Sequence, residues 1–452
     1  MKHRLYLTLI ILPLLFASSC VPVVDDVFDS PAAERMAAKQ KELRTLLASA
    51  ENGWLADYYP DKKAALGGYA MQFHFYADGT VDATCEMDTH LPAGESDESE
   101  YDIIYDQSVL LTFNTYNKVL HFFSEPKGSS DVDGWAGDYE FILMDITDAG
   151  DIVMKGKKWE RRLVLRRCDA AFDFQDYIRN VEATFDAISG YGMFAFQSEQ
   201  DTNVWITGTV VDRTFNVTYN DTDTTSVTEK LPYTITNNGI RLYEPTTIQN
   251  VTFENFVWNE ADEKYACADP GVDLKGIPYF PPDYQLKYAE ILGRWRLNYK
   301  AYLTNSVDTV EITLKKKNAT FTLSCPKIFT FPYELTFDAA KGTIALTSQA
   351  LGFHEPSGYY IRACAYAMDP SGSASYQTSV GTYGMVGNWN HDEGGERKIT
   401  LVNNGRWTVD VNRFFGITLR TFTSAGTYVG TFTGNIGGGY RFTDMVLTKL
   451  DD

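Results

Sequence analysis

Short runs of alternating apolar and polar residues, joined in pairs by turn dipeptides, dominate this sequence. The run 71–75 alternates, Asp78-Gly79 follows it, and the run 81–85 alternates again. The same arrangement recurs around Asn238-Gly239, Lys341-Gly342 and Asn404-Gly405. A period of two is typical of strands, and these dipeptides tolerate the positive φ of hairpin turns. The pattern therefore predicts a mainly β chain of antiparallel meanders or barrel-like sheets, with no parallel α/β sheet.

Helical spacing interrupts this pattern in three places, at about 31–50, 172–189 and 284–292. Ser30 suits the cap of the first helix and Pro31 its first turn, while Gly190 ends the second. These helices make the N-terminal part α+β. Two or three short helices are therefore expected, and the third is the shortest.

The helices and polar segments divide the chain into parts. We expect a signal peptide at 1–19, a lipid tether at 20–30, helix-plus-sheet domains at 31–170 and 171–284, and an all-β domain at 285–452. The first two domains suggest a duplication. The polar segments 91–100, 127–137 and 369–379 are predicted to be loops.

The last domain opens on Gly293-Arg294-Trp295, and Gly387-Asn388-Trp389 repeats the motif. A Gly-x-Trp at the start of a meander is typical of lipocalin-like barrels, in which the Trp plugs one end. The alternative is a turn glycine followed by an ordinary core Trp.

The N-terminus has the pattern of an export signal. Lys2 and Arg4 precede an almost wholly apolar run at 5–16, and Ala17-Ser18-Ser19-Cys20 follows. Small residues before a cysteine indicate lipid attachment at Cys20, with cleavage before it. An ordinary secretory signal with an incidental cysteine is the alternative. The run is shorter than the ~20 residues that a spanning helix needs.

The residues behind Cys20 indicate where the lipid would anchor the chain. Val21 stands where inner-membrane retention uses Asp, which favours the outer membrane, and Asp25-Asp26 favours surface display. Several acyl chains, such as palmitate, attached to one residue can anchor a protein stably to a membrane without a transmembrane helix.

Composition narrows the function classes. A formal net charge of −20 argues against nucleic acid as a partner, and 44% apolar residues exclude disorder as the main state. Five cysteines remain besides Cys20, none with metal or redox spacing, so buried unpaired thiols are expected rather than a disulfide scaffold.

A search for catalytic or metal-binding patterns finds none that is specific. His74 and His121 lie in strand-like patterns, and the His391 segment 391–396 is interpreted as a solvated turn. Asp131-Val132-Asp133 with Asp138 resembles half a calcium loop without its remaining ligands. We therefore predict no catalytic residue, no metal and no cofactor, although a glycosidase-type carboxylate pair has no sequence motif.

Aromatic residues are the remaining indication, since Tyr and Trp bind sugars and peptides through their faces and polar groups. Trp135, in a Gly- and Asp-rich segment, is the candidate ligand-binding residue. The alternative is that the aromatic residues simply fill the cores.

Several local motifs resemble one known family. They are Phe28-Asp29-Ser30-Pro31, Asn52-Gly53-Trp54-Leu55, Gly67-Gly68-Tyr69, Gly137-Asp138-Tyr139-Glu140-Phe141 and Lys155-Gly156-Lys157-Lys158. The chain thus resembles the lipoproteins catalogued as domain of unknown function number 4302, from Gram-negative gut anaerobes. The resemblance implies an outer-membrane location and, as partner, a TonB-dependent transporter or its surface-binding protein. No catalytic residue can be carried over from the resemblance, because the family has none assigned.

These observations predict a non-enzymatic, lipid-anchored accessory or binding protein of a nutrient-uptake system. Its ligand would be a glycan, a peptide or another small molecule. A glycan-directed surface hydrolase with a carboxylate pair and a structural or adhesion lipoprotein are the alternatives.

Overall fold

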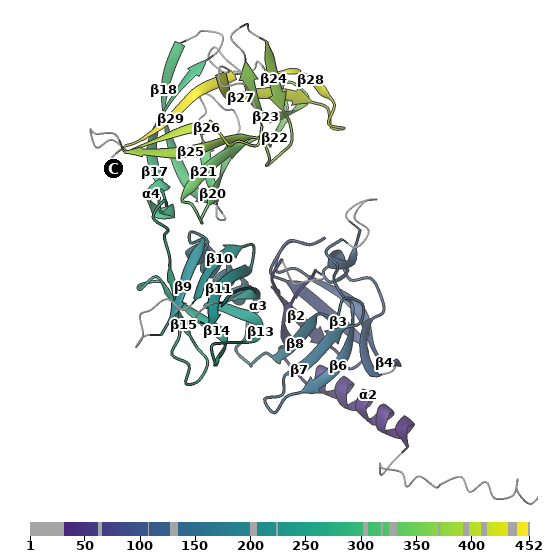
Figure 1. Ribbon diagram of the computed structural model, residues 1–452. Helices are drawn as coiled ribbons and strands as arrows, with labels where there is room; N and C mark the ends of the chain where they lie inside the picture. The colour runs from purple at the N-terminus through teal and green to yellow at the C-terminus, as the bar shows by residue number, and fades with distance from the viewer. Residues whose placement is uncertain are drawn as a thin grey trace, which may run out of the picture.

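Three antiparallel β-barrels, each preceded by a helix, follow one another along the chain in the computed structural model (Figure 1). The structure describes residues 31–61, 66–106, 108–126, 134–198, 206–222, 225–301, 306–317, 320–324, 332–368, 371, 373–391, 397–407, 414–432 and 441–450. The expected mainly β, antiparallel and barrel-like fold is confirmed. The described part of the chain contains no helix that could span a membrane.

The first barrel follows helix α2 (Ala32–Ala48). Its strands pair in sequence order, and β8 closes the ring onto β1. The strands are β1 (Trp54–Tyr58), β2 (Tyr69–Phe75), β3 (Thr80–Cys85), β4 (Ser96–Asp106), β5 (Ser108–Phe113), β6 (Glu140–Ile146), β7 (Ile152–Gly156) and β8 (Arg162–Arg167), with a short 3₁₀ helix, η1 (His121–Ser124), before β6.

The second barrel follows helix α3 (Phe174–Ile188), whose N-cap Asp173 accepts a hydrogen bond from the Asp176 amide. It closes through the pairing of β16 with β9. Its strands are β9 (Met193–Gln197), β10 (Ile206–Val211), β11 (Thr214–Thr222), β12 (Thr225–Thr236), β13 (Gly239–Ile248), β14 (Val251–Asn259), β15 (Lys264–Cys267) and β16 (Lys275–Pro278).

The third sheet follows helix α4 (Tyr288–Ile291). Because β29 pairs with both β26 and β17, a closed ring forms within it. The ring contains β17 (Gly293–Ala301), β18 (Ser306–Lys317), β19 (Thr320–Ser324), β20 (Tyr333–Asp338), β21 (Thr343–Thr347), β25 (Gly384–His391), β26 (Arg397–Asn403) and β29 (Arg441–Lys449).

Further strands continue the third sheet beyond β29, and we call them the extension. They are β22 (Gln349–His354), β23 (Tyr359–Met368), β24 (Ala374–Gln377), β27 (Phe414–Phe422) and β28 (Tyr428–Thr431). In Figure 1 they lie at the end of the third barrel where β24 and β28 are labelled.

The first and third barrels each have a buried tryptophan in their first strand. Trp54 is the first residue of β1 and Trp295 the third residue of β17, and their indole Nε1 atoms donate to Leu47 O and Ile291 O of the preceding helices at 2.8 Å. The last strand places Arg167 and Lys449 over these rings, at 4.8 and 5.0 Å from the centroids. The position of Trp295 matches the lipocalin-like expectation for the third barrel.

Three local expectations are wrong. The segment 369–379 was predicted to be a loop, but 374–377 within it is strand β24, which pairs with β23. The segment 91–100 was predicted to be a loop, but from Ser96 it is strand β4, because Ser99, Tyr101 and Ile103 alternate into the core. His121 does not lie in a strand. It begins η1, because Asn117 Oδ1 accepts hydrogen bonds from the amides of Val119 and Leu120 and turns the chain there.

The predicted helices and turns otherwise appear where expected. Pro31 is the N-cap of α2 rather than its first helical residue, and Ser30 lies outside the described residues. The first three predicted hairpins form at Asp78-Gly79, Asn238-Gly239 and Lys341-Gly342. Asn404-Gly405 follows β26, and its predicted partner run, 407–409, lies outside the described part except for Trp407.

Candidate functional site

The mouth of the second barrel holds a cavity of about 360 Å³. The C-terminal end of α3, the β10–β11 turn and the β20–β21 turn of the third barrel surround it. Its apolar lining consists of Phe185, Ile188, Tyr191, Phe194, Val210, Ile235 and Phe337, with the ring faces of Tyr233 and Tyr265. A concave, mainly apolar pocket with a few polar groups is the usual form of a small-molecule site.

Local sequence features place the walls of this cavity. The apolar face of α3 packs into the second core through Ile178, Val181 and Ile188, so the helix end lies over the barrel mouth. Gly192 lets the third barrel approach closely. A Cβ there would lie 2.2 Å from backbone atoms of Ala339 and Ala340, and the Gly192 amide donates to Ala339 O at 3.1 Å.

Tyr233 and Tyr265 supply two hydroxyl groups of the cavity, which Ser189 and Tyr191 also line. Burial raises the pKa of both phenols well above the usual value of 10, so both stay protonated at neutral pH. Neither hydroxyl makes a hydrogen bond within the described part of the chain. Two protonated hydroxyls without partners can orient a ligand by hydrogen bonds, but they cannot act as bases.

The charged residues at the rim have other partners. Arg213 Nη1 donates to Gly68 O at 2.6 Å and to the Glu86 carboxylate in the first barrel. Burial raises the pKa of Glu86 despite the opposing charge of Arg213. This pair therefore connects the first two barrels rather than presenting a charge to the cavity.

A second buried cluster joins the same two barrels. The Asp57 carboxylate lies 2.9 Å from Arg166 Nη1 in the first barrel and 2.7 Å from Arg241 Nη1 in the second. Burial alone would raise the pKa of Asp57, but the charges and hydrogen bonds of Arg241 and Arg166 together lower it. Because its charge is already shared between two arginines, this carboxylate is a structural link.

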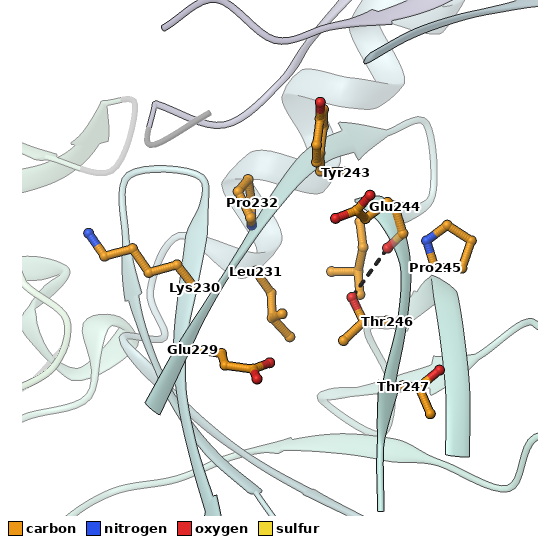
Figure 2. A pocket seen from close by; sticks show the side chains of 10 residues that line it. Glu229, Lys230, Leu231, Pro232, Tyr243, Glu244, Pro245, Thr246 and Thr247 are labelled. Carbon is orange, nitrogen blue, oxygen red and sulfur yellow. Dashed lines mark hydrogen bonds between the residues drawn. The ribbon is translucent and has the colours of Figure 1, made fainter. Parts of the chain in front are cut away.

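A second cavity, of about 340 Å³, lies where β12 and β13 diverge (Figure 2). These strands pair only from Tyr233–Leu242 to Thr236–Gly239. Glu229 and Glu244 both line the opening, and both are exposed. A general acid needs an apolar environment that disfavours its charged form, which these exposed positions do not provide.

The candidate Trp135 lies apart from both cavities. It is half-buried at the edge of the first core, with ring contacts to Tyr69, Phe122 and Phe123 at 6.0 to 6.4 Å between centroids. Its role in ligand binding stays a prediction.

Other candidates from the sequence fall in different places. Cys20, Asp131 and Asp133 lie outside the described residues, and so does 392–396. Asp138 accepts hydrogen bonds from the amides of Lys158 and Trp159, so it holds a turn. Within the described ranges no group of His, Cys, Asp and Glu could hold a metal ion.

The cysteines of the described part are free thiols. Cys85, Cys168 and Cys364 are buried and Cys267 is half-buried, while Cys325 lies outside the described residues. Burial raises the pKa of the Cys85 thiol to about 12 and that of Cys168 to about 11. Such thiols remain protonated and are poor nucleophiles.

Sequence reasoning did not find Tyr233 or Tyr265. Both occupy alternating positions of β12 and β15, as any core aromatic residue does. Only the closure of the barrel and the approach of the third barrel show that they line a cavity.

Comparisons with known proteins give two family matches. The model of a domain of unknown function, DUF4302, matches residues 24–260, a range that ends directly after β14. A second model, DUF4987, also described as a domain of unknown function, matches residues 268–415. No curated protein matches the chain.

Proposed function

The chain belongs to the DUF4302 family, and from this premise we propose that it is a lipid-anchored, non-enzymatic binding protein of the outer membrane that serves nutrient uptake. The binding site is the cavity at the mouth of the second barrel. A TonB-dependent transporter or its surface-binding partner is the proposed recipient of the ligand.

The anchoring half of the proposal rests on the signal pattern that ends at Cys20. Between Cys20 and the start of α2 at Ala32 the chain has room for a short tether. Acylation at Cys20 would hold the three barrels near the membrane surface.

The binding half rests on one observation, the aromatic cavity with two hydroxyl groups that have no partner in the described chain. Its volume lies near the lower end of the usual range of ~300 to 1,000 Å³ for ligand pockets. It therefore suits one small ring-containing molecule or one unit of a longer chain. The rings would stack on its faces, and Tyr233 and Tyr265 would orient its polar groups.

The test is a calorimetric screen of the soluble chain, from residue 21 onward, against glycans, peptides and small ring compounds. For a ligand found in this way, the double variant Tyr233→Phe, Tyr265→Phe should weaken binding about 30-fold, because two hydrogen bonds worth about 1 kcal/mol each are lost. Val210→Trp should abolish binding, since Val210 lines the cavity.

The matched control is Val307→Trp, which changes an exposed valine in β18 outside both cavities. The proposal fails if no compound binds, or if Val210→Trp and Val307→Trp bind the ligand equally well. An absence of any ligand would favour the structural or adhesion role.

The same screen tests the hydrolase alternative through the second cavity. Turnover of a glycan that is lost in both Glu229→Gln and Glu244→Gln would establish a carboxylate-pair mechanism there and would replace the binding role. Binding without turnover is the expected result.

A further inference from the structure

The extension of the third barrel presents two arginines side by side. Arg362 of β23 and Arg420 of β27 are directly opposite in register. Opposite side chains of an antiparallel pair have Cβ atoms about 5 Å apart and share one face of the sheet, and like charges there repel. This arrangement needs a compensating negative charge.

The described part of the chain does not supply that charge. Neither arginine forms an ion pair with any residue that the structure describes. Among the described residues of the extension, 349–368, 373–377 and 414–432, Glu355 is the only acidic side chain, and it lies in the turn between β22 and β23. The site is thus basic in a chain whose net charge is −20.

Arg420 is held rigidly and still has unused donors. Only 6% of the residue is exposed. Its Nη1 donates to Tyr428 OH at 2.6 Å and to Thr431 Oγ1 at 3.0 Å, and its guanidinium lies 4.1 Å from the Tyr376 ring centroid. Its Nε is buried and has no hydrogen-bond partner among the described residues. That atom is too enclosed to reach a ligand, but a nearly buried guanidinium without a counter-ion is costly, so the site favours an anion beside it.

Aromatic rings surround the two arginines. Arg362 lies 4.7 Å from the Phe422 centroid, and Tyr360 is opposite Phe422 in register. Phe353, Tyr360 and Tyr428 are 43%, 43% and 42% exposed. Exposed rings next to guanidinium groups offer flat apolar contacts beside fixed positive charge.

We propose that this arginine face, formed by Arg362, Arg420, Tyr360, Tyr376, Phe422 and Tyr428, binds a carboxylate or sulfate group carried on a sugar ring. The guanidinium forks match the oxyanion, and the aromatic rings stack on the sugar. A peptide fits less well, because the backbone groups of β23 and β27 are already paired with each other. The site is separate from the cavity of the second barrel.

The experiment is calorimetry of the full chain with three tetrasaccharides: galacturonate, sulfated galactose and neutral galactose. The first two distinguish a carboxylate from a sulfate as the recognised group, and at least one should bind while the neutral sugar does not. Arg420→Gln and Arg362→Gln should each weaken binding about tenfold or more. Because each variant has lost a charge, salt should weaken its binding less than it weakens binding of the parent.

The controls separate binding from folding. Arg362 makes no hydrogen bond to a described residue, so Arg362→Gln should keep the melting temperature and stay informative even if Arg420→Gln does not fold. Arg294→Gln removes an exposed arginine that is paired with Glu311 at 3.0 Å, and it should bind like the parent. Val210→Trp should also bind like the parent, because it alters only the second-barrel cavity.

The proposal is overturned if acidic and neutral sugars bind equally, if neither acidic sugar binds at millimolar concentration, or if Arg362→Gln binds as the parent does. Preferential binding of an acidic aromatic peptide over both acidic sugars would also overturn it.

Discussion

Buried ion pairs join the first two barrels, and they are the least predictable residues of the molecule. Asp57 and Arg241 are 184 residues apart in sequence, and Glu86 and Arg213 are 127 apart. No local pattern links residues at such separations, and only the closed barrels bring them together. Burial of such charges is favourable only where partners satisfy them, as the two arginines do for Asp57.

Replacing Asp57 should destabilise the chain more than an ordinary surface change. Asp57→Asn leaves Arg166 and Arg241 without their shared carboxylate, which should reduce the free energy of unfolding by about 3 kcal/mol. Asp148→Asn, at an exposed turn, should change it by less than about 0.5 kcal/mol. Urea unfolding at neutral pH measures both, and equal losses would show that Asp57 is not a structural link.

The difference in unfolding free energy between the parent and Asp57→Asn should also depend on pH. The pKa of Asp57 is lower in the folded state than its usual value of 3.8, so the stabilisation is complete well above 3.8 and is lost as the pH falls through the lower folded-state value. The difference in unfolding free energy between the parent and Asp57→Asn should therefore be constant near neutral pH and shrink below about pH 4. A constant difference down to pH 2 would contradict this.

At the scale of elements, the sequence predicts what depends on local patterning. The hairpins at Asp78-Gly79 and Lys341-Gly342 and the helix at Phe174–Ile188 follow from alternation, turn chemistry and helical spacing. Strand β4 was missed because its acidic and serine-rich exposed face hid the alternation of its buried face. Closure of each ring depends on the pairing of first and last strands, which no local signal contains.

The contact between the second and third barrels depends on one glycine. Gly192→Ala would place a Cβ 2.2 Å from backbone atoms of the β20–β21 turn, so the turn should move away and weaken the contact by about 1 to 3 kcal/mol. Small-angle scattering should show a larger radius of gyration. Gly430→Ala is the control, because its nearest neighbour would be 3.7 Å away. An unchanged scattering profile for Gly192→Ala would contradict the close contact.

At the scale of the whole molecule, the two proposed ligand sites lie on separate surfaces of the three barrels. The aromatic cavity lies at the junction of the second and third barrels, and the arginine face lies on the extension. The sequence predicted the barrels and the expected anchor, but it singled out Trp135, which lies at the edge of the first core. The residues of both surfaces come from strands that are distant in sequence, so composition alone did not single them out.

Native mass spectrometry of the chain extracted from its own membranes tests the central claim most directly. The account predicts a chain that begins at an acylated Cys20 and carries a bound small molecule, which is absent from Val210→Trp but present in Val307→Trp. A chain without acyl groups, or a parent and a Val210→Trp variant with the same bound mass, would contradict a lipid-anchored protein that binds its ligand in the second barrel.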